Sequence, residues 1–329
     1  MQEKRRVVIA GGGAAGFFAA IACAEALGAA GEVTLHEATA HPLAKVRVSG
    51  GGRCNVTHAC FEPRELVRRY PRGGRELIGA FHRWQPRDTV SWFAARGVET
   101  KVEDDGRMFP VTDDSATIID CLRRAADTAG VRVLTTSGVR RAEAAGPGSF
   151  WLTLTDGSEV RCERLLIATG GNRSSAGFTI AESFGHTIEP LVPSLFTFHI
   201  DDARLIGLSG VSVENAVVTV AGTKLKTDGP LLITHWGASG PAILKLSAWG
   251  ARELAEVSYE FLLHVNWTGT HTRESLVKEL LAVRDKNPKK QIATWSPLAM
   301  PQRLWERLVV SSGIAATTVW AQVGNAALG

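Results

Sequence analysis

Three glycines spaced as Gly-x-Gly-x-x-Gly stand between a hydrophobic run, Val7–Ala10, and an alanine-rich run. These glycines are Gly11, Gly13 and Gly16. The first permits a tight turn, the second lets the backbone approach a phosphate, and the third lets a helix pack on a strand. A helix that begins here directs free N–H groups and partial positive charge at an anion. The pattern predicts a dinucleotide diphosphate site that includes the first helical residues, Ala14 and Ala15.

A carboxylate follows the next hydrophobic run at the spacing that this kind of site requires. The run Val33–His36 reads as a second strand, and Glu37 comes directly after it. Glu37 lies about 20 residues beyond the last glycine, where an acid hydrogen-bonds the adenosine ribose. A carboxylate at this position also disfavours a 2′-phosphate.

A second group of residues has the properties needed to hold a planar ring. Three consecutive glycines, Gly50–Gly52, supply a backbone that can lie flat, and Ser49, Arg53 and Asn55 supply donors. An isoalloxazine ring binds against such a flat backbone and accepts hydrogen bonds from such donors. A guanidinium at the ring edge would stabilise its anionic reduced form. Arg53 is therefore predicted both to bind the cofactor and to assist catalysis; the alternative is a salt bridge that stabilises the loop.

Further cofactor contacts are predicted in this loop and in a later glycine turn that follows a buried strand. Lys45 is predicted to meet the phosphates or the ribityl chain, with solvent as the alternative. Cys54 is interpreted as a buried thiol, because no second cysteine stands at Cys-x-x-Cys spacing. The complete set expected from these two segments is Lys45, Ser49, Gly51, Gly52, Arg53, Cys54, Asn55, Ala168, Thr169, Gly170 and Gly171.

A histidine in the second half of the chain is the remaining candidate for acid–base chemistry. His235 follows an apolar run and precedes Trp236-Gly237, a place from which an imidazole could reach a flavin. A histidine satisfied in a core or at a hinge is an equally good interpretation.

The elements that position these residues alternate in the first half and become β-rich in the second. Residues 41–57 are expected to form a long functional loop. Helices are expected at 62–70, 75–84, 88–96, 114–129, 241–249, 273–284, 301–310 and from 317 onward. An antiparallel excursion is expected over 131–134, 139–142, 150–155 and 159–162, before residues 164–171 return beside the first strand. Further strands are expected at 196–200, 211–220, 223–227, 231–235 and 257–267.

The length and composition of the chain are those of a globular protein. The chain has 329 residues, 45% of them hydrophobic, and a formal net charge of +4. This charge is too small to require nucleic acid. An arginine cluster at 64–75 is interpreted as a solvated surface. Five cysteines without metal-ligand spacing indicate reduced thiols, no metal site and a cytoplasmic protein. Glycines and Glu25 in the apolar stretch before Ala30 argue against a signal peptide or a membrane span.

Several strings together are similar to the YhiN/BaiN-type flavoproteins, also called the aminoacetone oxidase-like family. Besides the Gly11–Gly16 turn, these strings are Ser49–Asn55, Ala168–Gly171, 185–191, Gly229–Gly237 and Ser239–Leu244. The resemblance spans nearly the whole chain. It implies an α/β fold in which a Rossmann-like domain binds FAD, with an inserted β-barrel-like domain and a helical portion. It also implies an oxidoreductase whose substrate varies, from aminoacetone to unsaturated steroid-type compounds.

The change in patterning beyond Pro190 places the FAD domain at residues 1–190, the β-rich domain at 191–267 and the helical portion at 268–329. Two departures stand out. The stretch after Ala168–Gly171 is short, being 172–177, and the family's closing glycine-rich segment does not occur before Gly329. We therefore expect either a truncated form or an FAD pocket with one open wall.

The predicted activity is hydride transfer between a small organic substrate and flavin N5, with oxygen or a nicotinamide as the other redox partner. Within this class an amine oxidase and an NAD(P)H-dependent reductase are both open. The alternatives are a non-catalytic nucleotide- or nucleic-acid-binding flavoprotein module and an NAD-only dehydrogenase. The expected partner is a small molecule, with neither a membrane nor nucleic acid, and the oligomeric state is left open.

Overall fold

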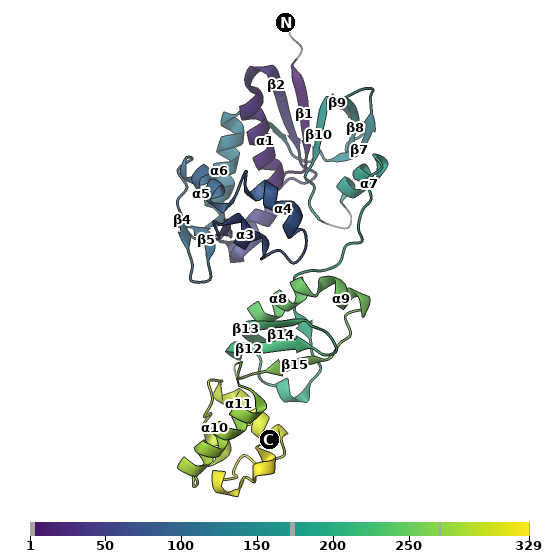
Figure 1. The fold of residues 1–329 in the computed structure, drawn as a ribbon. Coiled ribbons are helices and arrows are strands. Elements are labelled where there is room, and N and C mark those ends of the chain that lie inside the picture. Colours follow the sequence, from purple (N-terminus) through teal and green to yellow (C-terminus); the bar gives the residue numbers. More distant parts are fainter. Residues whose placement is uncertain (1–3, 172–174, 270, 329) are drawn as a thin grey trace. The chain divides into compact units, whose positions relative to one another are not determined.

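The chain folds into two compact units, Met1–Pro190 and Leu191–Gly329. The structure is a computed structural model that describes residues 4–171, 175–269 and 271–328 (Figure 1). Each unit has its own hydrophobic core and is described by itself.

A four-stranded parallel sheet forms the centre of the first unit. Its order is β10-β1-β2-β6. Its strands are β1 (Arg5–Ala10), β2 (Gly31–His36), β6 (Arg132–Leu134) and β10 (Arg164–Ile167). Ala10, the last residue of β1, is in register with His36 and with Ile167. The prediction that residues 164–171 return beside the first strand is therefore confirmed for β10. Since these strands end at one edge of the sheet, the segments that follow them meet there.

Helices α1 (Ala14–Leu27) and α6 (Ser115–Thr128) share a hydrophobic core with one face of this sheet. Phe17 and Ile21 of α1, both almost fully buried, lie in that core with Leu35 of β2. Asp114 caps α6, because its carboxylate accepts the Ala116 N–H at 2.8 Å. The two helices fix the position of the turn after β1.

The other face of the sheet packs against an antiparallel sheet and a helix (Figure 1). These elements are β7 (Val139–Ala144), β8 (Phe150–Leu154), β9 (Glu159–Cys162) and α7 (Ala176–Ser183). The predicted antiparallel excursion is confirmed for these three strands. It is wrong for 131–134, since β6 pairs in parallel with β2 and extends the central sheet.

The segment between β2 and α6 carries short helices and a small antiparallel sheet. The helices are α2 (Ala44–Val48), α3 (Pro63–Val67), α4 (Gly74–Phe81) and α5 (Pro86–Ala94), and the strands are β3 (Thr57–His58), β4 (Thr100–Val102) and β5 (Arg107–Pro110). The expected long loop over 41–57 is thus partly wrong, because α2 and a 3-10 turn at Ser49–Gly52 lie inside it. Ser115 of α6 ties this region to the core by donating to the Arg47 carbonyl at 2.9 Å.

The β-rich half of the second unit is a five-stranded sheet with order β11-β14-β13-β12-β15. Its elements are β11 (Phe198–His199), β12 (Ser212–Val220), β13 (Lys226–Thr234), β14 (Gly237–Ser239), β15 (Leu263–Asn266), α8 (Pro241–Trp249) and α9 (Ala251–Glu256). The strands expected at 223–227 and 231–235 belong to one strand, β13, because its pairing with β12 shifts register at Gly229 and Pro230 and continues beyond them. In the described residues β11 and β15 are edge strands, so the sheet is open, and the expected β-barrel-like form of this domain stays a prediction.

The remaining residues of the second unit form a separate helical cluster. Helices α10 (Arg273–Lys286) and α11 (Gln302–Ser311) pack around the fully buried Trp320. The helix expected from 317 onward is wrong, since only short 3-10 turns occur at Trp320–Gln322 and Asn325–Ala327. Trp320, Val323 and Leu328 nevertheless share one core with side chains of α10 and α11.

None of the helices in the described ranges combines the length and the apolar character that crossing a bilayer needs.

Candidate dinucleotide site

A cavity of about 940 Å³ lies in the first unit where β1, β2 and β10 end. Twelve of the predicted cofactor residues line it. They are Gly11, Gly13, Ala14, Ala15, Glu37, Lys45, Ser49, Cys54, Asn55, Ala168, Thr169 and Gly170. Segments far apart in the sequence thus meet at one site, as the parallel sheet requires.

The glycine turn has the geometry that its spacing predicts. Gly11 has φ +114°, and a β-carbon there would lie 2.4 Å from the Ala168 carbonyl oxygen. A β-carbon at Gly16 would lie 1.9 Å from the Gly11 carbonyl oxygen, so this residue carries the contact between helix and turn. Gly13 differs, because no atom lies within 4 Å of the place where its β-carbon would stand. Two glycines therefore serve packing, and the third faces open space.

The beginning of α1 offers hydrogen-bond donors to that space. Gly13 is the N-cap residue; no described side chain caps the helix, and its first turn holds no acidic residue. The first N–H groups of a helix have no partner within it, and its dipole favours an anion at this end. Ala14 and Ala15 are exposed and line the cavity. A diphosphate would satisfy these groups.

Glu37 is held rigidly at the end of β2. One carboxylate oxygen accepts the Gly12 N–H at 2.7 Å, and the other accepts the N–H and the hydroxyl of Thr39, each at 2.8 Å. An ionised carboxylate has about four lone-pair sites, so acceptor capacity is left for ribose hydroxyls. The predicted ribose ligand is therefore in position and preorganised.

The two ends of the Ser49–Asn55 loop reach the cavity. The Cys54 N–H donates to the Ser49 carbonyl at 3.0 Å, which closes the loop on itself. Cys54 is buried, and this burial raises the pKa of its thiol. A protonated thiol is a poor nucleophile, so the interpretation of Cys54 as a buried structural residue agrees with its surroundings.

The centre of this loop is not part of the cavity lining. Gly51 and Gly52 were predicted to lie along the ring, yet the cavity lining includes neither residue, and no atom lies within 4 Å of their β-carbon positions. Gly50 packs instead on β5: with φ +58°, its β-carbon would lie 2.7 Å from the Phe109 ring. The glycines let the loop bend tightly over Phe109.

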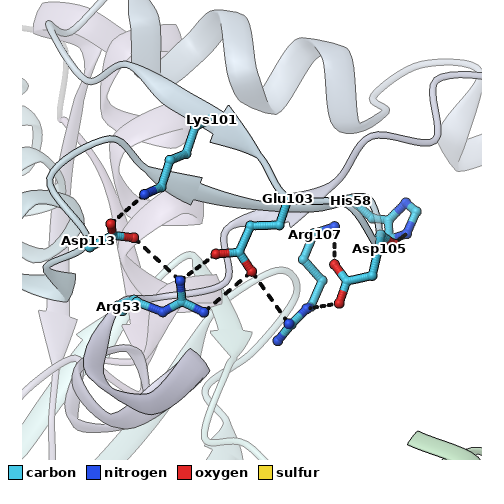
Figure 2. A network of polar contacts seen from close by, with 7 residues as sticks. All are labelled: Arg53, His58, Lys101, Glu103, Asp105, Arg107 and Asp113. Atoms are coloured by element: carbon cyan, nitrogen blue, oxygen red, sulfur yellow. Dashed lines mark hydrogen bonds and ion pairs between the residues drawn. The ribbon is translucent and has the colours of Figure 1, made fainter. Parts of the chain in front are cut away.

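Arg53 belongs to a network of ion pairs beside the cavity and is not part of its lining (Figure 2). Its guanidinium contacts Glu103 through two nitrogens and lies 3.5 Å from an oxygen of Asp113. Glu103 thereby holds the pKa of Arg53 above its ordinary value, and Lys101 holds the pKa of Asp113 below its own. The network continues through Arg107, Asp105 and His58.

The same guanidinium stacks on the ring that supports Gly50. The Arg53 Cζ atom lies 4.0 Å from the centroid of Phe109, which is fully buried. Arg53 and Gly50 thus fasten both sides of the loop to one phenyl ring. The geometry favours the salt-bridge interpretation of Arg53, and its direct contact with a flavin stays a prediction.

We expect the substitution Arg53→Lys to weaken FAD binding about two- to fivefold, because lysine keeps the charge but loses the planar stacking and the forked contact with Glu103. Binding of ADP-ribose, which lacks the flavin ring, should not change. Titration calorimetry with both ligands measures the difference. Arg107→Lys is the matched control, since Arg107 stands 5.4 Å from the same ring and is not part of the loop. Equal losses for both ligands would contradict the positioning role.

Lys45 and the turn after β10 complete the polar side of the cavity. A β-carbon at Gly170 would lie 3.5 Å from the Lys45 Nζ atom, so the ammonium stands over this turn. Thr169 accepts a hydrogen bond from the Ser175 hydroxyl at 2.5 Å. Gly171 is exposed and is not part of the lining. Lys45 is the only lysine or arginine in the cavity lining that the described residues form.

His235, the predicted acid–base residue, lies in the second unit. It occupies the exposed two-residue turn between β13 and β14, where Thr234 pairs with Gly237. Its ring centroid lies 3.9 Å from that of Trp236. An exposed turn excludes the core interpretation, and its role in acid–base chemistry stays a prediction.

Sequence reasoning missed the apolar side of the cavity. Its residues come from α1, α2, α5, α6 and neighbouring segments. They are Phe18, Leu43, Val46, Val56, Trp84, Phe93, Ile118 and Leu122. Amphipathic periodicity predicts that a helix buries one face but not whether that face meets a core or a cavity. The missed polar lining residues are Thr39, His41 and Thr89, of which the first two stand within four positions of Glu37 and could have been found by their proximity to it.

Together these features define a dinucleotide-binding protein of the Rossmann type. The uncapped helix end, the open β-carbon position at Gly13 and the ribose-binding carboxylate fit the diphosphate and adenosine parts of FAD. Residues 5–315 match the family model described as "HI0933-like protein Rossmann domain". The chain therefore belongs to the HI0933-like family of Rossmann flavoproteins, which confirms the YhiN/BaiN-type resemblance, and the family supports an FAD-dependent oxidoreductase.

Three curated relatives cover most of the chain. The ribosomal RNA dihydrouridine synthase of Escherichia coli (strain K12) is 33% identical over 302 residues, which are 87% of this chain and 70% of that protein. The protein of the same name from Haemophilus influenzae is 27% identical over 85% of this chain and 68% of its own length. The 3-dehydro-bile acid delta(4,6)-reductase of Clostridium scindens is 26% identical over 91% of this chain and 73% of that protein.

Among solved structures, the open conformation of a flavocytochrome c3 fumarate reductase has a TM-score of 0.42 and 18% identity. It covers 64% of this chain, and the chain spans 47% of its length.

Proposed function

We propose that this protein is an FAD-dependent reductase of a carbon–carbon double bond conjugated with a carbonyl group. The observation that carries the proposal is the cavity at the end of the parallel sheet, with its uncapped helix end, its fixed carboxylate and its apolar wall. The relatives supply the reaction type. Dihydrouridine is uridine whose ring double bond beside a carbonyl has been saturated, and a 3-dehydro steroid with delta(4,6) double bonds is likewise a conjugated ketone.

The first unit would bind the cofactor through three groups. The N–H groups at the start of α1 would hold the diphosphate, Glu37 would accept from the ribose, and Ser49, Asn55 and Thr169 would offer further polar atoms in the cavity lining. The apolar wall from Phe18, Trp84 and Phe93 excludes water from the bound ring. When bound, FAD supplies two-electron hydride chemistry at ring N5.

Reduction of the double bond requires a hydride at the carbon remote from the carbonyl and a proton at the adjacent carbon. We propose a nicotinamide as the hydride source, oxidised in the process. Negative charge develops on the carbonyl oxygen, and Lys45 is the cation of the described cavity lining that could stabilise it. His235 stays the predicted proton donor.

We propose a uracil base within RNA as the first substrate to test, because two relatives carry that activity in their names, one at 33% identity. This revises the expected small-molecule partner. The C. scindens relative makes a steroid-type conjugated ketone the second substrate class.

Anaerobic stopped-flow absorbance tests the reaction type. The flavoprotein should be bleached by NADH or NADPH, and a conjugated ketone or a uridine-containing RNA should restore its colour. Bleaching by an amine together with a failure of every conjugated substrate to restore colour would show an amine oxidase and would overturn the proposal.

A further inference from the structure

We propose that the surface formed by α3, α4 and the beginning of α5, residues 61–87, binds the phosphodiester backbone of RNA and delivers a base to the neighbouring cavity. This proposal rests on the proposed function for its substrate. It concerns binding, and binding can be measured without turnover. Below, these residues are called the arginine surface.

The charge of the arginine surface is concentrated. It holds seven arginines against three glutamates, whereas the whole chain has a formal net charge of only +4. All seven arginines are exposed. They are Arg64, Arg68, Arg69, Arg72, Arg75, Arg83 and Arg87. Exposed cations clustered on one face raise the local concentration of polyanions and speed their association.

Much of this charge is uncompensated. Arg68 pairs with Glu65 at 2.7 Å, but Arg64, Arg69 and Arg75 form no ion pair within the described ranges of the chain. A surface whose only purpose is solvation commonly carries alternating signs, as the network around Arg53 does. Three arginines without an ion pair, on α3, on the turn after it and on α4, are suited to successive phosphates.

Exposed aromatic rings lie among these arginines. Phe61, Tyr70 and Trp84 are 36%, 40% and 42% exposed. The guanidinium of Arg87 lies 5.2 Å from the centroid of Phe61. Cations that follow a backbone, together with rings on which bases stack, are the elements of a single-stranded nucleic-acid site. The aromatic rings set this surface apart from the merely solvated face that the sequence alone suggested.

The arginine surface continues into the cavity through Trp84. This residue lines the cavity while remaining 42% exposed, so it stands at the rim. Its ring meets Phe18 of α1 at 5.2 Å in an edge-to-face contact, and its Nε1–H donates to Thr89, another lining residue, at 3.0 Å. An enzyme that acts on a base must take it out of its stack. A backbone held by the arginines would place such a base at the rim.

Fluorescence anisotropy with a labelled uridine-containing RNA stem-loop tests the binding. The triple variant Arg64→Gln/Arg69→Gln/Arg75→Gln should bind about 100-fold more weakly at 0.1 M salt, and its salt dependence should be shallower by about 2, since each single-strand phosphate contact contributes about 0.7 to the slope. The control is Arg140→Gln/Arg141→Gln/Arg161→Gln, which removes the same charge from exposed positions on β7 and β9.

A second variant tests the stacking. Tyr70 is exposed and is not part of the cavity lining, and its ring packs on Phe81 at 5.6 Å. Tyr70→Leu should weaken RNA binding by at least about fivefold without changing the salt slope, because stacking is not ionic. Circular dichroism confirms that each variant is folded.

The outcomes test RNA binding by the arginine surface separately from the proposed reaction. Selective loss of RNA binding in the arginine triple supports the arginine surface, even if bound RNA is never reduced, in which case the proposed function fails alone. Three results would overturn RNA binding by the arginine surface. They are an equal loss of RNA affinity in both triple variants, no RNA binding by the wild type, and binding of an acidic peptide as tight as that of RNA. Reoxidation of the reduced protein by a small conjugated ketone should be the same in wild type and arginine triple, and this result would leave the proposed function intact.

Discussion

Replacing Gly13 by alanine is expected to weaken FAD binding at least tenfold while the cofactor-free protein keeps its stability. The residue has φ −82° and ψ −175°, a conformation that alanine adopts readily, and the new methyl group would meet no protein atom within 4 Å. It would stand where a diphosphate must approach the helix end. Losing one hydrogen bond to a charged group costs about 1.5–3 kcal/mol, or roughly ten- to a hundredfold in affinity.

Gly11→Ala is the matched comparison, since it makes the same chemical change two residues away. Its φ of +114° is unfavourable for alanine, and the methyl group would lie 2.4 Å from the Ala168 carbonyl oxygen. This variant should lower the unfolding temperature even without FAD, through about 1–3 kcal/mol of backbone strain in addition to the clash. Differential scanning fluorimetry and FAD titration on both variants give the test. An unaltered FAD affinity in Gly13→Ala would show that the diphosphate does not bind at this helix end.

Glu37→Ala should reduce the affinity for FAD and for ADP-ribose alike, by about ten- to a hundredfold. The carboxylate accepts from Gly12 at 2.7 Å and from Thr39 at 2.8 Å, so its loss frees both the glycine turn and the ribose hydroxyls. The affinities of Glu37→Gln should lie between those of the wild type and of Glu37→Ala, because an amide presents an NH₂ group to one of these donors.

Glu32→Gln controls for the loss of charge on the same strand. Glu32 pairs with Arg132 at 2.7 Å on the surface and does not line the cavity. Calorimetric titration with both ligands distinguishes Glu37 from Arg53, whose substitution should affect FAD alone. If Glu37→Ala bound ADP-ribose as tightly as the wild type, the adenosine half of the ligand would not lie beside β2.

The sequence predicted the part of the site that depends on backbone geometry. Gly11, Gly13 and Gly16 have separate physical roles that spacing alone specifies, and Glu37 follows a strand whose parallel pairing with β1 fixes its place. The place of β10 beside β1 followed from the same reasoning, whereas β6 was wrongly assigned to the antiparallel excursion. Local rules succeed here because each residue is within a few positions of the strand end that places it.

Side-chain roles that depend on distant partners could not be predicted. Arg53 was expected either at the ring edge or in a salt bridge of the loop, and the structure supplies the partners, since Glu103 and Asp113, 50 and 60 residues away, hold it against Phe109. Nothing near Arg53 in the sequence indicates these carboxylates. Similarly, Gly229 and Pro230 are typical of a turn, yet they lie inside β13 because pairing with β12 overrides local preference.

Hydrogen exchange of the cofactor-free wild type, measured with and without FAD, tests the central claim most directly. The account predicts stoichiometric binding that protects the amides of residues 11–15, 54–56 and 168–170, since these segments line one cavity. Absence of binding, or binding that leaves the amides at the beginning of α1 unprotected, would contradict it.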